Sequence, residues 1–371
     1  SFAFFGKEAQ FSTLNIILPV GISFYTFQTL SYTIDVYYKR LEPTKNIISF
    51  LAFVSFFPQL VAGPIERATN LLPQFYKKRE FNYANAVDGL RQALWGLFKK
   101  VVIADNCAKY ANIIFNNSDD YSGSTLFLGA FLFAFQIYGD FSGYSDIAIG
   151  ISRLFGFDLK RNFAFPYFSR DIAEFWRRWH ISLSTWFRDY VYIPLGGSRG
   201  GTLMKIKNTF IIFLVSGFWH GANWTFIIWG FLNALYFLPL MLAKKNRVNT
   251  DIVAQGKYLP NLREVFQMAR TFLITIIAWV FFRANTVEHA FTFLRDMFSW
   301  SLFSAPAIFP NYIKYLLFGF LIVEWLGRHG EYAIERIDNI KKPLRWSLYL
   351  ILIVLMFRFA GEKQAFIYFQ F

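Results

Sequence analysis

The feature that most constrains this chain is a succession of long apolar segments, each close to the length that crosses a membrane. A helix needs about 20 mostly apolar residues to span a bilayer. Such segments lie at about 14–37, 47–63, 86–106, 125–151, 205–220, 222–242, 266–283, 310–326 and 344–358. They predict an all-α, multi-pass membrane protein, and the mean hydropathy of +0.33 agrees with that class.

The charged residues gather between these segments. Only 17% of the residues are Asp, Glu, Lys or Arg, against about 25% in soluble proteins, and the net charge is +14. The Lys and Arg residues form short clusters beside apolar segments, such as "YKKRE", "GLFKK" and "LAKKNR". This placement is typical of loops on the cytoplasmic face of a membrane. We therefore expect contact with membrane lipid and no nucleic-acid partner.

Two connecting segments lack basic clusters and are predicted to lie on the far side of the membrane. Residues 107–124 carry one Lys and two Asp, and residues 298–312 carry no charge. No internal repeat or disordered linker is visible, so we predict a single membrane domain over 1–371. Because the chain starts at Ser1 rather than Met, we expect further helices upstream in the natural protein.

Three segments depart from the pattern of a plain spanning helix. Pro19 and Gly21 are expected to kink the first segment. The charges within 86–106 favour an amphipathic, interfacial helix. The stretch "YGDFSGYSDIAIG", at 138–150, combines glycines with two Asp and resembles an interrupted helix.

The segment 158–207 is too charged for a membrane span and too aromatic for a solvated loop. Its residues 170–191 predict a helix that Ser169 caps. One polar face of that helix would hold residues four positions apart, namely His180, Ser184 and Arg188. Charged helices at membrane depth are stable only when buried in protein or lining a water-filled cavity. We therefore expect a re-entrant helix that lines a vestibule.

Two of the four histidines lie in aromatic sequence at membrane depth. His220 stands in "SGFWHGANW" between two apolar segments, and His180 stands in "FWRRWHISLS". An ionisable side chain there costs free energy unless it is paired or functional, so both histidines are candidates for catalysis. His289, near a predicted helix start, and His329, in a polar turn, are interpreted as surface or helix-terminal residues.

Other kinds of site remain open from the residues alone. Gly217 and Gly221 flank His220 and predict close helix packing, and Cys107, the only cysteine, cannot form an intrachain disulfide. A metal site has no His-x-His or HExxH spacing to support it; its acidic ligands would be Asp140, Asp146 or Asp189. A serine nucleophile lacks the G-x-S-x-G motif; the serines near a histidine are Ser182, Ser184 and Ser216.

The motifs together resemble the membrane-bound O-acyltransferase family. The resemblance rests on "FWRRWHISLSTWFRDYVYIPLGGSR" and "NTFIIFLVSGFWHGANWTFIIWG". Supporting stretches are "ILPVGISFYTFQTLSYTIDVY", "FVSFFPQLVAGPIER", "LWGLFKKVVIAD", "YGDFSGYSDIAIG" and "FIYFQF". The chain is most similar to the bacterial branch that O-acetylates alginate. This implies a ring of tilted and broken transmembrane helices around a central tunnel.

The resemblance also implies an enzyme that moves an acyl group from a thioester to a hydroxyl. The family's catalytic histidine corresponds to His220, and its upstream polar position corresponds to His180. A neutral His220 would act as general base, with acetyl-CoA or an acyl carrier protein as donor and no bound cofactor or metal. The residues expected to bind substrate or line the tunnel are Asn223, Trp219, Trp176, Arg177, Arg188 and Asp189.

Two subsites are expected beside the base. A donor to the tetrahedral oxyanion would come from the residues nearest in sequence, which are Asn223, Trp219 and His180. A cationic funnel for the phosphates of the donor would be formed by arginines, namely Arg177, Arg178, Arg188 and Arg199.

The implied setting is the bacterial cytoplasmic membrane, with O-acetylation of an envelope or secreted polysaccharide such as alginate or peptidoglycan. The acetyl group would reach the sugar directly or through a serine of a partner, expected to be an extracytoplasmic SGNH-type acetyltransferase. Three alternatives stay open: D-alanyl transfer to teichoic acid from a carrier protein, transport of the acyl donor, and a non-catalytic scaffold.

Overall fold

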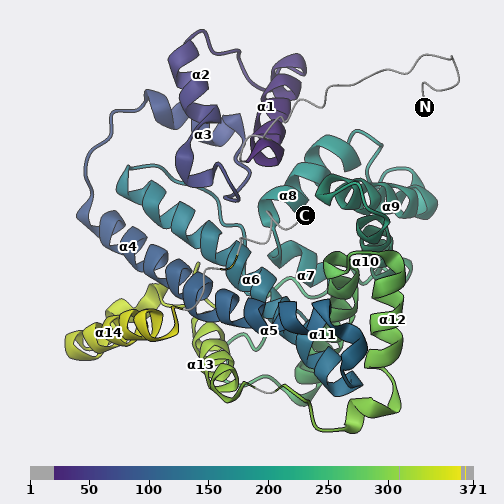
Figure 1. Ribbon diagram of the computed structural model, residues 1–371. Helices are drawn as coiled ribbons and strands as arrows, with labels where there is room; N and C mark the ends of the chain where they lie inside the picture. Colours follow the sequence, from purple (N-terminus) through teal and green to yellow (C-terminus); the bar gives the residue numbers. More distant parts are fainter. Residues whose placement is uncertain (1–20, 309, 361–363, 365–371) are drawn as a thin grey trace, which may run out of the picture.

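A computed structural model describes residues 21–308, 310–360 and 364 (Figure 1). All regular structure in these residues is helical, as predicted. The α-helices are α1 (Ile22–Tyr37), α2 (Ile47–Val54), α3 (Ala68–Tyr76), α4 (Tyr83–Phe98), α5 (Asp105–Asn116), α6 (Gly123–Leu154), α7 (Ile172–Arg178), α8 (Ile181–Phe187), α9 (Gly201–His220), α10 (Trp224–Leu242), α11 (Leu262–Arg283), α12 (Val287–Met297), α13 (Asn311–Gly327) and α14 (Lys342–Phe359). Pro19 and the motif "FIYFQF" lie outside the described residues.

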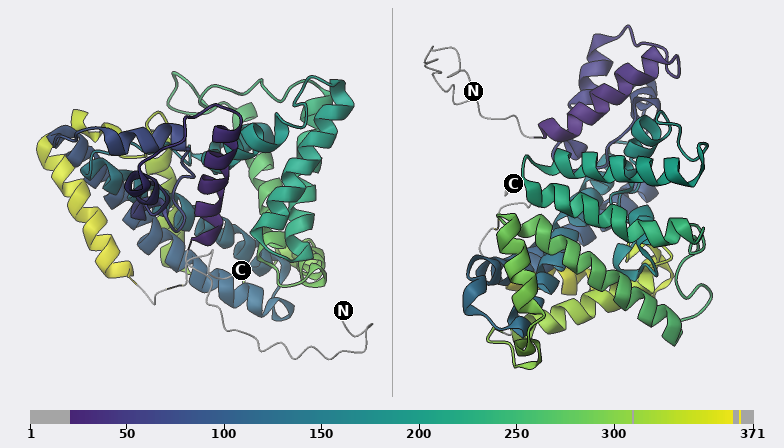
Figure 2. Two further views of the ribbon diagram at one scale, coloured as in Figure 1. Left: turned by 90° about the horizontal axis from the view of Figure 1, so that it is seen from above. Right: turned by 90° about the vertical axis from the view of Figure 1, so that its right-hand side faces the viewer.

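Most predicted segments correspond to one helix each. Three of the helices, α6, α10 and α11, are long and apolar enough to cross a membrane. α9, α13 and α14 begin and end within a few residues of the predicted spans 205–220, 310–326 and 344–358. α14 lies at the edge of the molecule (Figure 2, left view). The predicted span at 47–63 is wrong: α2 ends at Val54 and a separate 3₁₀ turn, Phe57–Gln59, follows.

The longest element is a rod made of α4, a π-helical segment (Lys99–Ala104) and α5, which packs along α6 (Figure 1). The predicted loop at 107–124 is therefore wrong as far as Asn116. The predicted break at 138–150 is also wrong, because α6 continues through it. A Cβ on Gly150 would collide with the carbonyl oxygen of Gly89, so the glycines of this stretch bring two helices together instead of ending one.

The charged side chains within 86–106 form ion pairs, three of them with residues of α6, and the placement of this helix at the membrane interface stays a prediction. Lys99 is buried and forms an ion pair with Asp146. The Nζ of Lys100 lies 2.7 Å from a carboxylate oxygen of Asp140. Removing one member of a buried ion pair costs about 3–5 kcal/mol. The carboxylates of α6 thus serve the packing of the rod, which spacing along one helix does not reveal.

The predicted helix at 170–191 is broken at His180. α7 ends at Arg178 and α8 starts at Ile181, while His180 adopts a left-handed conformation with φ 44° and ψ 54°. Asp171, and not Ser169, caps α7 through a side-chain hydrogen bond. The shared polar face does not form, because His180 is 2% exposed and the side chain of Arg188 is 60% exposed.

The connections at the two ends of the helix bundle differ in charge. One end carries Lys and Arg in its connections 38–46, 77–82, 243–261 and 328–341. The connections at the opposite end, 117–122, 221–223, 284–286 and 298–310, contain neither. The two segments predicted for the far side meet there, where the backbone N–H of Gly123 donates to Ser301 Oγ at 2.8 Å. We call these the basic end and the non-basic end of the bundle.

Candidate active site

His180 and His220 line one small enclosed cavity. Its volume is about 20 Å³, which is room for about one water molecule. Besides the two histidines, Ser216 is the one lining residue that carries a hydroxyl. The remaining walls are chiefly aromatic: Phe141, Trp176, Trp179, Trp229, Trp279 and Phe282.

His180 is held by Asn162, which lies in the extended segment before α7. The Nδ1 of His180 is 3.1 Å from Asn162 Oδ1. The same oxygen accepts the backbone N–H of Ser182 at 3.2 Å, while the Asn162 amide nitrogen donates to Ser145 Oγ. A backbone N–H can only donate, so the oxygen of the amide must face it and His180. His180 therefore carries its hydrogen on Nδ1.

This tautomer leaves a lone pair on Nε2 of His180. No hydrogen-bond partner faces that atom within the described part of the chain. The ring is wedged between aromatic side chains and meets Phe141 edge-on, with ring centroids 4.5 Å apart. His180 thus presents a fixed acceptor in an apolar, enclosed site.

His220 is the last residue of α9 and faces α10 and α11. Its ring centroid lies 5.1 Å from that of Trp229 on α10 and 5.0 Å from that of Phe282 on α11. α9 and α10 pack against each other as neighbouring rods (Figure 2). A Cβ on Gly217 would collide with the carbonyl oxygen of Phe226. The predicted close packing around His220 is confirmed at Gly217, and this contact sets where the imidazole lies.

Two of the predicted tryptophans lie beside the histidines. Trp176 lines the cavity and donates from Nε1 to Asn233 Oδ1 at 3.2 Å. Trp219 packs its ring 4.7 Å from that of His220 and 5.1 Å from that of Phe27 on α1. Trp176 is therefore part of the cavity wall, whereas Trp219 does not line the cavity and packs against the His220 ring.

The sequence matches the family model "MBOAT, membrane-bound O-acyltransferase family" over residues 38–282, which includes both histidines. The chain belongs to the membrane-bound O-acyltransferase family. Family membership agrees with the helical architecture and with the three helices that are long and apolar enough to cross a membrane.

Several curated proteins resemble this family member. It is 42% identical to the "Probable alginate O-acetylase AlgI" of Azotobacter vinelandii, over 89% of this chain and 64% of that protein. It is 40% identical to the "Peptidoglycan O-acetyltransferase" of Helicobacter pylori, over 78% and 58% of the two chains. The "Teichoic acid D-alanyltransferase" of Bacillus subtilis is 29% identical, over 60% and 58%. The chain spans about three fifths of the length of these relatives.

Three predicted tunnel residues of this acyltransferase-family chain lie away from the cavity. Asn223 caps α10 by accepting from the N–H of Thr225, and its amide donates to the carbonyl oxygen of Asn285 at 2.9 Å. Arg188 pairs with its neighbour Asp189 at 2.8 Å near the surface. Neither the Asn223 amide nor this ion pair reaches the two imidazoles.

Three of the four arginines predicted to form a phosphate funnel, Arg177, Arg178 and Arg188, are bound to protein groups. Arg177 donates to the carbonyl oxygens of Asn246 and Asn249, at 2.9 and 2.6 Å. Arg178 donates to Glu174 and to the carbonyl oxygen of Asp251. These bonds hold the connection 243–261 over the basic end. Arg199 is exposed in the turn that precedes α9.

The site also contains residues whose roles the sequence did not reveal. Asn162 gave no signal, because it lies 18 positions before His180 in an irregular segment. Ser216 was considered only as a nucleophile, yet it stands one helical turn before His220 on α9 and lines the same cavity. Among the described residues, no three His, Cys, Asp or Glu side chains are grouped so as to hold a metal ion.

Proposed function

We propose that this chain is the membrane part of an O-acetyltransferase that passes an acetyl group from a thioester to a hydroxyl. The observation that carries the proposal is the shared cavity, with one imidazole fixed as an acceptor and a second at the end of α9. The O-acetylases and the O-acetyltransferase named above, at 40–42% identity, support the choice of acetyl.

The chemistry needs one base and one hydrogen-bond donor. Neutral His220 takes the proton of the acceptor hydroxyl while the hydroxyl oxygen attacks the thioester carbonyl carbon. His180 Nε2, an acceptor, stabilises the imidazolium that forms. The tetrahedral intermediate then collapses, the C–S bond breaks, and the leaving thiolate receives from His220 the proton that the hydroxyl gave up. No net proton is gained or lost.

The oxyanion of the intermediate requires a donor. The Nδ1–H tautomer of His180 presents only a lone pair on Nε2, and the Asn223 amide is committed to Asn285. Ser216 lines the cavity and carries a hydroxyl, a group that can donate a hydrogen bond. We assign the oxyanion contact to Ser216.

The charge of the two ends suggests the direction of transfer. Basic connections lie on the cytoplasmic side of bacterial membranes, so the basic end would face the cytoplasm and admit acetyl-CoA or an acylated carrier protein. The acceptor would enter from the non-basic end. It would be an envelope or secreted polysaccharide, alginate-like or peptidoglycan, or a serine of an SGNH-type partner that passes the group on.

D-alanyl transfer to teichoic acid is the second candidate. It is supported by the relative from Bacillus subtilis, at 29% identity over 60% of this chain. The same base and oxyanion contact would serve it, with an aminoacyl thioester as donor. Transport of the donor and a scaffold role leave the two cavity imidazoles without a use.

The test is substitution in the full-length protein in its own host. His220→Ala and His180→Gln are expected to abolish or strongly reduce the acyl content of the envelope, while His329→Ala, outside the cavity, leaves it unchanged. Protein level in the membrane is measured for each variant. Normal acyl content in the His220→Ala strain would refute the proposal, and the mass of the missing group distinguishes acetyl from D-alanyl.

A further inference from the structure

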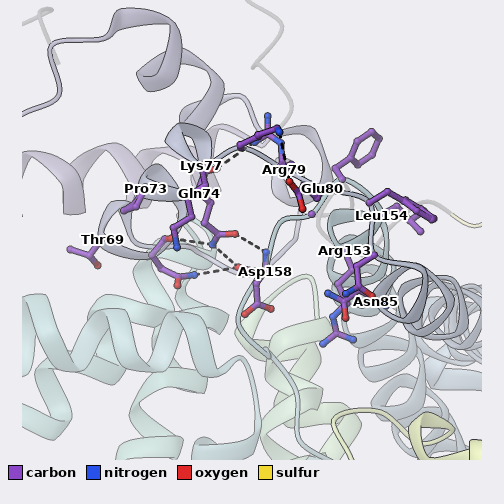
Figure 3. Close-up of a pocket in the computed structure, with 16 residues that line it drawn as sticks. Thr69, Pro73, Gln74, Lys77, Arg79, Glu80, Asn85, Arg153, Leu154 and Asp158 are labelled. Carbon is purple, nitrogen blue, oxygen red and sulfur yellow. Dashed lines mark hydrogen bonds and ion pairs between the residues drawn. The ribbon is translucent and has the colours of Figure 1, made fainter.

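A polar pocket separate from the histidine cavity opens at the basic end, where α3, the start of α4 and the end of α6 meet (Figure 3). Its volume is about 790 Å³, and it shares no lining residue with the cavity. Four cationic side chains and two carboxylates line it. The cations are Lys77, Lys78, Arg79 and Arg153, and the carboxylates are Glu80 and Asp158.

One wall of the pocket is fixed by hydrogen bonds between α3 and the segment after α6. The backbone N–H of Asp158 donates to Gln74 Oε1 at 2.8 Å, and Gln74 Nε2 donates back to the carbonyl oxygen of Asp158 at 2.9 Å. Figure 3 shows this pair with Lys77 and Arg79 above it and Arg153 across the pocket. Arg153 is already held in an ion pair with Asp88, so Lys77, Lys78 and Arg79 are the cations left beside a preformed space.

The cations are not all neutralised within the pocket. Arg79 lies with its guanidinium 4.5 Å from the centroid of the Phe157 ring, a contact that orients it without cancelling its charge. Lys78 pairs loosely with Glu80, at 3.7 Å on an exposed surface. Lys77 has no ion-pair or hydrogen-bond partner in the described structure. An anion is the ligand that this arrangement favours.

Two of the lining residues are large, exposed aromatic side chains. Phe81 and Phe155 are 77% and 52% exposed. Aromatic residues of this kind concentrate where the headgroups meet the hydrocarbon of a bilayer. The basic end of this chain therefore places a cationic pocket and an aromatic rim at the same depth.

We propose that this pocket binds the phosphate headgroup of an anionic phospholipid from the leaflet at the basic end. Basic pockets beside membrane helices recognise such headgroups by charge. The aromatic rim favours a lipid over a soluble phosphate ester, because its rings would contact the acyl region. Lipid binding in this pocket does not depend on the acyl-transfer chemistry. An experiment can therefore refute lipid binding without refuting acyl transfer, and the reverse.

The test uses the full-length protein in nanodiscs of phosphatidylglycerol, phosphatidylcholine or their mixture. Lys77→Glu/Lys78→Glu is compared with Lys244→Glu/Lys245→Glu, which makes the same charge change on exposed residues at the same end but outside the pocket. Native mass spectrometry counts the phosphatidylglycerol that stays bound. The pocket variant should lose at least 5-fold more bound lipid than the control, with unchanged thermal unfolding.

A second variant and a competition sharpen the outcome. Arg79→Gln should lower phosphatidylglycerol retention in the same direction. Inorganic phosphate and coenzyme A, each added at millimolar concentration, should not displace the lipid. The proposal would be overturned if both lysine variants lost phosphatidylglycerol equally, or if phosphatidylcholine were retained as well as phosphatidylglycerol. Displacement of the lipid by inorganic phosphate or coenzyme A would also overturn it, in favour of a soluble ligand.

Discussion

His180 donates its Nδ1 hydrogen to Asn162 Oδ1 across 3.1 Å, and this bond decides which nitrogen of the imidazole faces the cavity. Asn162 is itself fully buried and tied to Ser145 and Ser182. The acceptor character of His180 is thus set by a side chain that does not line the cavity, and the first prediction follows from it.

Asn162→Ala should lower the rate of acyl transfer by roughly 10- to 100-fold, because His180 loses the partner that fixes its tautomer and orientation. Leaving the Ser182 N–H buried without an acceptor should also cost about 1–3 kcal/mol of stability. Transfer per molecule in isolated membranes and thermal unfolding in detergent measure the two effects. Asn162→Asp keeps the acceptor oxygens and should retain more activity than the alanine variant. Equal activity of both variants would contradict the assignment.

Ser216→Ala removes the hydroxyl that we place at the oxyanion. Loss of one such donor lowers kcat by about 10²–10³ in enzymes where it has been isolated, and a weaker donor gives a loss toward the lower figure. The expected result is a lower kcat with little change in KM for the thioester. Ser184→Ala is the matched control, since Ser184 lies near His180 in sequence but not on the cavity. A raised KM with an unchanged kcat would assign Ser216 to ground-state binding.

Gly217→Ala should push α9 from α10, because the new methyl group would meet the Phe226 carbonyl. Overpacking of this kind costs about 1–3 kcal/mol, and the shift would also displace His220. We expect a lower unfolding temperature together with reduced transfer. Gly319→Ala on α13 is the control, since its methyl group would meet nothing within 4 Å. That variant should be neutral or more stable by up to about 1 kcal/mol. An unchanged Gly217→Ala protein would show that the helices adjust freely.

The connection 243–261 should loosen in acid. The hydrogen bond from Arg170, 2.9 Å from Asp251 Oδ1, holds the pKa of that carboxyl below its ordinary value of 3.8. A carboxyl whose pKa is lower in the folded state stabilises the fold at pH values above its unfolded-state pKa. That stabilisation is lost as the pH falls through its folded-state pKa. The contribution is therefore complete at neutral pH and disappears below about pH 3.8.

Asp251→Asn tests this linkage. The unfolding temperature of the variant should lie below that of the parent at pH 6, and the difference should shrink below about pH 3.8. Asp120→Asn, at the opposite end, changes an acid with no ion-pair partner among the described residues and should show no such convergence. A constant difference from pH 6 to pH 3 would mean that Asp251 acts by packing alone.

Local sequence patterns predicted the helices correctly where one apolar stretch forms one helix. They predicted α6, α10 and α11 because length and hydropathy are properties of a continuous segment. They failed at 138–150, where glycines and two aspartates suggested a break. The glycines there meet the backbone of α4, and the aspartates meet lysines of the same rod. A pattern within one helix cannot show a partner that lies forty or more residues away.

The sequence by itself determined the class of the protein, the basic clusters that distinguish its two ends, and the two histidines in aromatic surroundings. Only the tertiary structure decided how those histidines are used. It broke the helix at His180, brought Asn162 to its Nδ1, and placed Ser216 and His220 across the same cavity. Helix length and apolar character are set by neighbouring residues, whereas a tautomer and a shared cavity depend on side chains that meet only after packing.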